Sequence, residues 1–146
     1  HTKASKLIEG IFCGETIINT SMLCVADYLD GVDWIRSIGG LKGSIAKSEN
    51  NLSVIQTFVN DRKWIHFLAQ VPDQISNTSV CLTLDLKPDQ VKQMVKLLDI
   101  EAVAFDIGAY RDAPAGLRIW CGATVERYDL EALMPWLDWA YEYVSL

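Results

Sequence analysis

The sequence has few of the residues on which metal centres and nucleophilic catalysis depend. Only two of its 146 residues are histidines, and His66 falls inside an apolar run, where we expect a packed or edge residue rather than a catalytic base. The four cysteines (Cys13, Cys24, Cys81 and Cys121) form no C-x-x-C pair. We therefore predict no metal site and no Ser/His or Cys/His catalytic pair. We expect the cysteines to be reduced thiols in the hydrophobic core.

Long apolar runs and an excess of positive charge are also missing. No run approaches the roughly 18 apolar residues that a membrane-spanning helix needs, and neither a signal peptide nor a G-x-G-x-x-G or Walker-type loop is visible. The net charge is −6, from 13 basic and 19 acidic residues. Such an acidic chain is a poor partner for nucleic acid or an anionic membrane surface. We therefore expect a cytoplasmic protein that binds neither.

The apolar periodicity predicts four helices and four strands. Helical spacing covers residues 21–38, 41–62, 88–99 and 125–143. Branched and aromatic residues predict strands at 64–69, 79–86, 101–108 and 117–123. The order α-α-β-β-α-β-β-α predicts an α+β fold, a small and mostly antiparallel sheet with helices packed on it. No repeat or linker divides residues 1–146, which we predict to be a single domain.

Two of the predicted helices carry further expectations. The helix over 21–38 is apolar around most of its circumference, which is typical of a helix buried on several sides. The glycine pair at 39–40 should end it. On the last helix, Trp136 and Trp139 could form a surface patch that marks a subunit contact.

Two arginines, Arg111 and Arg118, stand on either side of a short loop that leads into a predicted strand. A guanidinium is charged at every working pH and binds a carboxylate or phosphate through two parallel hydrogen bonds. A loop arginine beside a rigid strand arginine would suit a small substrate with two acidic groups. The alternative is that both are surface arginines paired with nearby carboxylates, namely Asp106, Asp112 or Glu126.

A second candidate anion site precedes the first predicted helix. Asn19, Thr20 and Ser21 stand where the first backbone N–H groups of that helix lack partners. Such an end can hold a phosphate through its amides and its partial positive charge. The alternative is ordinary capping of the helix by these polar side chains.

Three segments carry a resemblance to a known family. They are KLIEGIFCGETIINTSMLCVADYLDGVDW (6–34), SNTSVCL (76–82) and DIGAYRDAPAGLRIWCGATVE (106–126). They resemble the C-terminal part of the phosphoserine aminotransferases, a family of class V aminotransferases that depend on pyridoxal 5'-phosphate. The resemblance implies that residues 1–146 are the C-terminal domain of a longer enzyme. It also implies that the Schiff-base lysine lies in an N-terminal domain absent from this chain, so that the chain alone would not catalyse transamination.

The same resemblance implies roles for particular residues. Arg118 takes the position of the arginine that binds the α-carboxylate of the amino acid, and Arg111 takes the position of the one near the substrate phosphate. Tyr110 stands where some relatives have histidine, and the loop to Arg118 is one residue longer. Asn19 and Thr20 are similar to a segment that reaches the cofactor phosphate of the other subunit of a homodimer, although here they are shifted by one residue.

The implied reaction exchanges an amino group between L-glutamate/2-oxoglutarate and phosphoserine/3-phosphohydroxypyruvate in serine biosynthesis. Two alternatives stay open at this point. The chain could be a domain of another class V aminotransferase with a different small substrate. It could also be a non-catalytic α+β binding module that has the fold without the chemistry.

Overall fold

The structure, a computed structural model, describes residues 2–3, 6–7, 9–15 and 21–146. The chain divides into two compact units, residues 1–40 and 41–146, and each is described by itself. The first unit contains strands β1 (Thr2–Lys3) and β2 (Lys6–Leu7), which pair antiparallel, a 3-10 helix η1 (Glu9–Cys13) and helix α1 (Met22–Ser37). Among the described residues, no helix combines the length and the apolar character needed to cross a membrane.

Helix α1 has the predicted ends but not the predicted burial. Ser21 caps its start, since the Ser21 side chain accepts a hydrogen bond from the backbone N–H of Cys24. Beyond its last residue Gly39 and Gly40 have φ angles of 99° and 68°, the left-handed conformation that ends helices. None of the described side chains of α1 is buried, so the prediction of a buried helix was wrong for this chain. An apolar circumference shows how much surface a helix can bury, whereas burial itself requires a neighbour.

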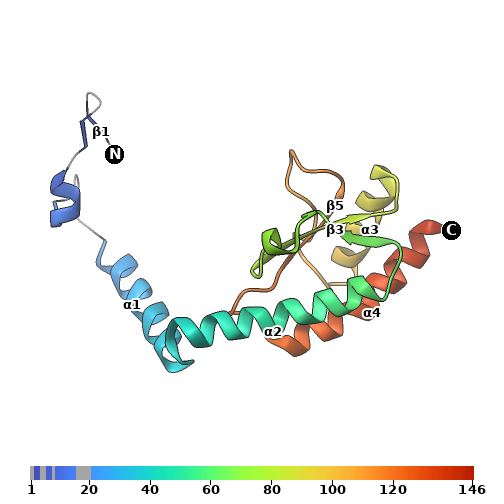
Figure 1. Cartoon of the computed structure of the whole chain (residues 1–146). Coiled ribbons are helices and arrows are strands. Elements are labelled where there is room, and N and C mark those ends of the chain that lie inside the picture. Colours follow the sequence, from blue (N-terminus) through green and yellow to red (C-terminus); the bar gives the residue numbers. More distant parts are fainter. Residues whose placement is uncertain (1, 4–5, 8, 16–20) are drawn as a thin grey trace. The chain divides into compact units, whose positions relative to one another are not determined.

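The second unit is a three-stranded sheet with helices packed on it (Figure 1). Its elements are α2 (Gly40–Asn60), β3 (Ile65–Phe67), the 3-10 helix η2 (Pro72–Gln74), β4 (Ser79–Leu84), α3 (Pro88–Ile100), β5 (Gly116–Trp120) and α4 (Arg127–Ser145). The strand order is β3-β4-β5, antiparallel throughout, with Phe67 opposite Leu82 and Cys81 opposite Arg118. The predicted α+β fold is therefore confirmed.

The strand predicted over residues 101–108 is not formed. Ala102 and Asp106 have φ angles of 55° and 52°, and two left-handed residues interrupt the extended backbone that a strand requires. Only the end of this segment reaches the sheet, where Gly108 forms a single antiparallel bridge with Leu117. The pairing of this segment with β5 is thus limited to this bridge and the backbone hydrogen bonds on either side of it, from Ala109 to Gly116 and from Arg118 to Ile107.

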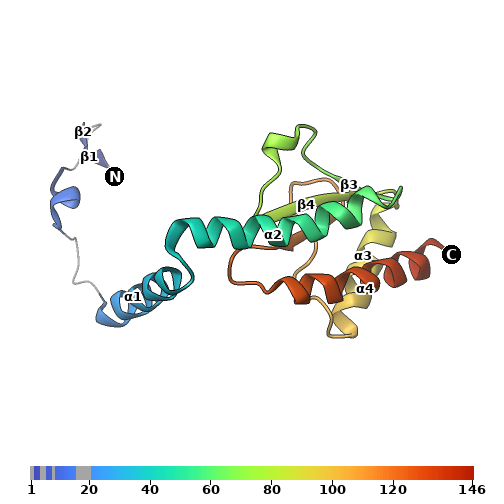
Figure 2. The same cartoon turned by 60° about the horizontal axis from the view of Figure 1, so that its bottom comes forward.

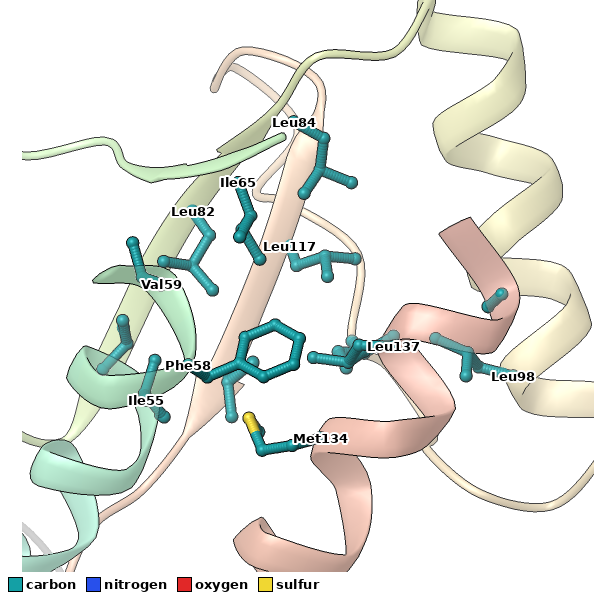
Figure 3. Packing of buried hydrophobic residues seen from close by; sticks show 14 of the residues in the cluster. Ile55, Phe58, Val59, Ile65, Leu82, Leu84, Leu98, Leu117, Met134 and Leu137 are labelled. Carbon is teal, nitrogen blue, oxygen red and sulfur yellow. The ribbon is translucent and has the colours of Figure 1, made fainter. Parts of the chain in front are cut away.

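The core of the second unit is formed by side chains of the strands and of helices α2, α3 and α4 (Figures 1 and 3). Figure 2 shows α2 passing in front of β4 with α4 beside it, and Arg62, just after the end of α2, forms an ion pair with Asp138 of α4. The cluster in Figure 3 includes Phe58 from α2 and Leu137 from α4. Alternate residues of β4 are buried, which is the period-two pattern of a sheet with one face covered. The other face is left available for polar side chains.

The cysteines differ from the core thiols that we expected. All four are free, but only Cys121 is buried, where burial raises the pKa of its thiol to about 11. Cys81 is half-buried, while Cys13 and Cys24 are exposed. The core prediction was therefore wrong for the last two; both lie in the first unit, where the apolar side chains that precede them, Phe12 and Leu23, are also exposed.

Gly116, the first residue of β5, lies very close to the backbone of the neighbouring strand β4. A Cβ atom at this position would lie 2.0 Å from the carbonyl oxygen of Leu82 in β4, which is a clash with backbone. We expect Gly116→Ala to lower the free energy of unfolding by about 1–3 kcal/mol, as overpacking typically does. Gly108→Ala is the matched control, because its Cβ would meet Val95 at an ordinary 3.8 Å. Urea unfolding of both variants should separate them, and equal stabilities would contradict the tight approach of β4 and β5.

Candidate functional site

Arg118 occupies the middle of strand β5. Its neighbours Leu117 and Ile119 are buried in the core, and because side chains alternate along a strand, Arg118 points to the other face. Its backbone N–H donates to the carbonyl oxygen of Ile107 at 2.8 Å, so the strand is held on both edges. The side chain is only 24% exposed. Arg118 is therefore a largely covered cation on a strand; the sequence predicted the strand but made no prediction of how far the side chain is covered.

The guanidinium of Arg118 has an acidic and an aromatic neighbour. Its Nη2 donates to Oδ2 of Asp106 at 2.5 Å and to the backbone carbonyl of the same residue at 3.1 Å. Its central carbon lies 4.6 Å from the centroid of the Tyr110 ring, which is within the range of a cation–π contact. Tyr110 first and Asp106 after it raise the pKa of Arg118, while desolvation opposes them. The pairing with Asp106 that we considered as an alternative is present.

This ion pair borders a cavity of about 550 Å³. Arg118, Tyr110 and Ser79 contribute polar groups to the wall, and the carboxylates of Asp106 and Asp129 also line it. Most of the remaining wall is apolar. A covered guanidinium beside an apolar wall is the arrangement that holds the acid group of a small organic molecule. The cavity is therefore the candidate functional site of the second unit.

Tyr110 connects this cavity to the sheet. Its hydroxyl lies 3.3 Å from the hydroxyl of Ser79 at the start of β4. The hydrogen bond with Ser79 first, and the neighbouring Arg118 after it, lower the pKa of Tyr110. Both interactions favour the phenol's oxygen as an acceptor. Tyr110 thus contacts the guanidinium of Arg118 through its ring and Ser79 through its hydroxyl.

Arg111 lines a different cavity. This second space, also of about 550 Å³, lies between α3 and the 108–116 segment, and Lys92 and Lys96 of α3 contribute to its wall. Tyr110 lines both cavities, so it stands at the border between them. The chain does not bring Arg111 and Arg118 together into one cavity. Arg111 is exposed and has no ion pair within the part of the chain that the structure describes.

Asn19 and Thr20 lie outside the described residues. Within the described ranges, no group of three or more His, Cys, Asp or Glu side chains is arranged to hold a metal ion. His66, on the edge strand β3, lies 3.4 Å from Asp85 and is exposed, which agrees with the expected edge position.

Sequence reasoning missed the residue that fastens the far end of β5. Asn51 of α2 is fully buried, and its Nδ2 donates to the carbonyl oxygens of Cys121, Gly122 and Val125 at 3.2, 3.2 and 2.8 Å. These carbonyls belong to the loop that leads from β5 to α4, and Val125 also lines the Arg118 cavity. A polar residue on the apolar face of the predicted helix over 41–62 was the available signal.

Comparisons with known proteins support the resemblance described above. No protein-family model matches the chain. Phosphoserine aminotransferases of Methanosarcina mazei and Methanosarcina barkeri are each 50% identical to it over 144 residues, which is 99% of the chain. The chain spans 39% of the length of each of these relatives.

Solved structures agree at the level of the fold. A phosphoserine aminotransferase from Bacillus circulans subsp. alkalophilus superposes with a TM-score of 0.67 and 21% identity, covering 76% of this chain and 30% of that one. A second phosphoserine aminotransferase, from a study of radiation damage of its Schiff base, superposes over the same shares with a TM-score of 0.66 and 17% identity. Over nearly its whole length, this chain is a homologue of part of the phosphoserine aminotransferases.

Proposed function

We propose that the chain is the C-terminal domain of a phosphoserine aminotransferase and that Arg118 binds the α-carboxylate of its substrate. The observation that carries this proposal is a strand-borne guanidinium, 24% exposed, on the wall of a cavity of about 550 Å³. The full-length enzyme would exchange an amino group between L-glutamate/2-oxoglutarate and phosphoserine/3-phosphohydroxypyruvate in serine biosynthesis, in the cytoplasm. The 50% identity to the Methanosarcina enzymes supports this choice of substrates.

The described residues do not by themselves fit the cofactor of such an enzyme. Pyridoxal 5'-phosphate needs a lysine amine for covalent attachment, and no lysine is among the residues that line the Arg118 cavity. Lys92 and Lys96 line the second cavity but are exposed on α3, unlike a desolvated reactive lysine. We therefore assign attachment of the cofactor to the part of the full-length protein outside this chain. This chain would supply the arginine that binds the substrate carboxylate.

Two further parts of the proposal concern the substrate phosphate and the subunit partner. Arg111, exposed on the loop before β5, would help to bind the phosphate from its own side of Tyr110. Asn19 and Thr20 would reach the cofactor phosphate of the other subunit of a homodimer. The exposed apolar side chains of α1, such as Met22 and Leu23 at 78% and 71%, are what a helix covered by other parts of that assembly would present.

An assay of the full-length protein tests this function. We expect it to form phosphoserine from L-glutamate and 3-phosphohydroxypyruvate, and to use unphosphorylated hydroxypyruvate at least tenfold less efficiently in kcat/KM, since charge-assisted bonds to the phosphate would be lost. Equal use of both keto acids would favour another class V aminotransferase. Absence of amino-group transfer to any small keto acid, in a protein loaded with cofactor, would favour the binding module.

A further inference from the structure

A guanidinium binds a carboxylate most strongly through two parallel hydrogen bonds. It can present two such forks, one from Nε and Nη2 and one from Nη1 and Nη2, and both forks include Nη2. In Arg118 this shared nitrogen is already occupied by two acceptors of Asp106, the carboxylate Oδ2 at 2.5 Å and the backbone carbonyl at 3.1 Å. Whichever fork a ligand uses, it therefore meets Asp106.

We propose that Asp106 is an internal competitor for the carboxylate-binding face of Arg118, and that it sets the affinity of this site for its ligand. The proposal rests on the proposed function in taking the ligand as the carboxylate of a small amino or keto acid. When that carboxylate arrives, the Asp106 side chain moves off Nη2 into solvent. Asp106 is thus a specificity-determining residue, because a ligand that offers only one weak acceptor gains less from Arg118 than a carboxylate does and is disfavoured by the competition.

The surroundings of Asp106 allow this movement. Its side chain is 89% exposed, so the carboxylate regains water when it leaves. An ion pair with one partner this exposed is worth little, which makes displacement inexpensive. The backbone of Asp106 has a φ angle of 52°, a conformation that Asp and Asn tolerate better than most residues. The same residue type that holds this turn therefore also supplies the competing group.

Arg118 does not depend on Asp106 for its own position. Its backbone is paired on both sides, with Cys81 of β4 and with Ile107. Its guanidinium also lies over the ring of Tyr110, which the Ser79 hydroxyl holds in turn. Loss of the Asp106 carboxylate should therefore leave Arg118 in place, with Nη2 bonded only to the backbone carbonyl of residue 106 and able to donate to a ligand. A residue that merely positioned Arg118 would have the opposite effect on ligand binding.

The test is Asp106→Asn in the full-length protein, with Asp112→Asn as the matched control. Asparagine keeps the shape and the left-handed turn and removes the charge. Asp112 is an exposed aspartate nearby with no ion pair within the described ranges, so its variant removes the same charge without touching Arg118.

We expect Asp106→Asn to lower KM for L-glutamate about two- to fivefold, the range of an exposed ion pair, and Asp112→Asn to leave it unchanged. Glutarate, a dicarboxylate that cannot be transaminated, should bind more tightly to Asp106→Asn by the same factor in calorimetry.

The outcomes separate this proposal from the function on which it rests. If Arg118→Ala weakens glutamate and glutarate binding while Asp106→Asn leaves it unchanged or weaker, the competitor role is overturned and the carboxylate site stands. If Asp112→Asn tightens binding as much as Asp106→Asn, the effect comes from the change in net charge that both variants share, and the proposal fails. If the protein transfers no amino group, glutarate binding still tests the competition directly.

Discussion

Replacing Arg118 by alanine in the full-length protein will raise KM for both L-glutamate and 3-phosphohydroxypyruvate by about 10- to 100-fold, the loss expected for hydrogen bonds to charged groups. Both substrates carry the carboxylate that Arg118 would hold, so both should be affected alike. Steady-state kinetics with each substrate varied in turn measures the effect. Arg118→Lys should recover only a part of the loss, because an ammonium keeps the charge without the planar fork.

Arg127→Ala provides the structural contrast for this experiment. Arg127 donates to Glu131, Asn50 and Ser53, and it is not among the residues that line the Arg118 cavity. We expect its removal to lower stability while leaving KM unchanged. We expect Arg118→Ala to raise KM while leaving stability nearly unchanged. Its partner Asp106 is already in solvent and loses little when left unpaired. An unchanged KM in folded Arg118→Ala protein would refute the carboxylate role.

The sequence predicts most of the fold because most of its elements depend on local patterns. Apolar spacing located the helix that begins at Pro88 and the alternating strand β4 correctly, since each buries one face. The same reasoning failed for residues 101–108. Apolar residues are frequent there, but Ala102 and Asp106 turn the chain out of the extended conformation, and side-chain composition does not reveal a left-handed backbone at residues other than glycine.

The site was predictable in part. Arg118 could be singled out from its place near the start of the strand predicted over 117–123 and from the family resemblance, and Asp106 was among the partners considered for it. Two features could be seen only in the structure. One is that the Asp106 carboxylate bonds to Nη2 of Arg118, and the other is that Arg111 and Arg118 line two different cavities. Both depend on how the 101–116 segment folds back on β5. That path is set by contacts between residues distant in sequence, which local patterns do not encode.

Asn51 is the clearest case of such a long-range contact, and Asn51→Asp should destabilise the second unit severely. The substitution replaces an amide donor by a carboxylate that faces three carbonyl oxygens at 2.8–3.2 Å, in a position with no exposure to solvent. We expect a loss of about 3–5 kcal/mol in the free energy of unfolding at neutral pH, as for an uncompensated buried charge. Urea unfolding followed by tryptophan fluorescence measures it.

The pH dependence of Asn51→Asp gives the prediction a second, independent readout. Burial among carbonyls favours the neutral acid, so the folded state should bind a proton that the unfolded chain releases near its ordinary pKa of about 3.9. The stability of the variant should therefore fall as the pH rises above this value, and part of the loss should be regained at pH 4.

Asn50→Asp is the matched control for this variant, one residue earlier on the same helix. Asn50 is exposed, and its Oδ1 already accepts a hydrogen bond from Arg127 at 2.6 Å, a role that a carboxylate performs equally well. The same chemical change should therefore alter stability by no more than about 0.5 kcal/mol, as for an ordinary surface substitution. If the two variants proved equally stable, the Asn51 amide would not hold the 121–125 loop. The wall that Val125 gives to the Arg118 cavity would then depend on packing alone.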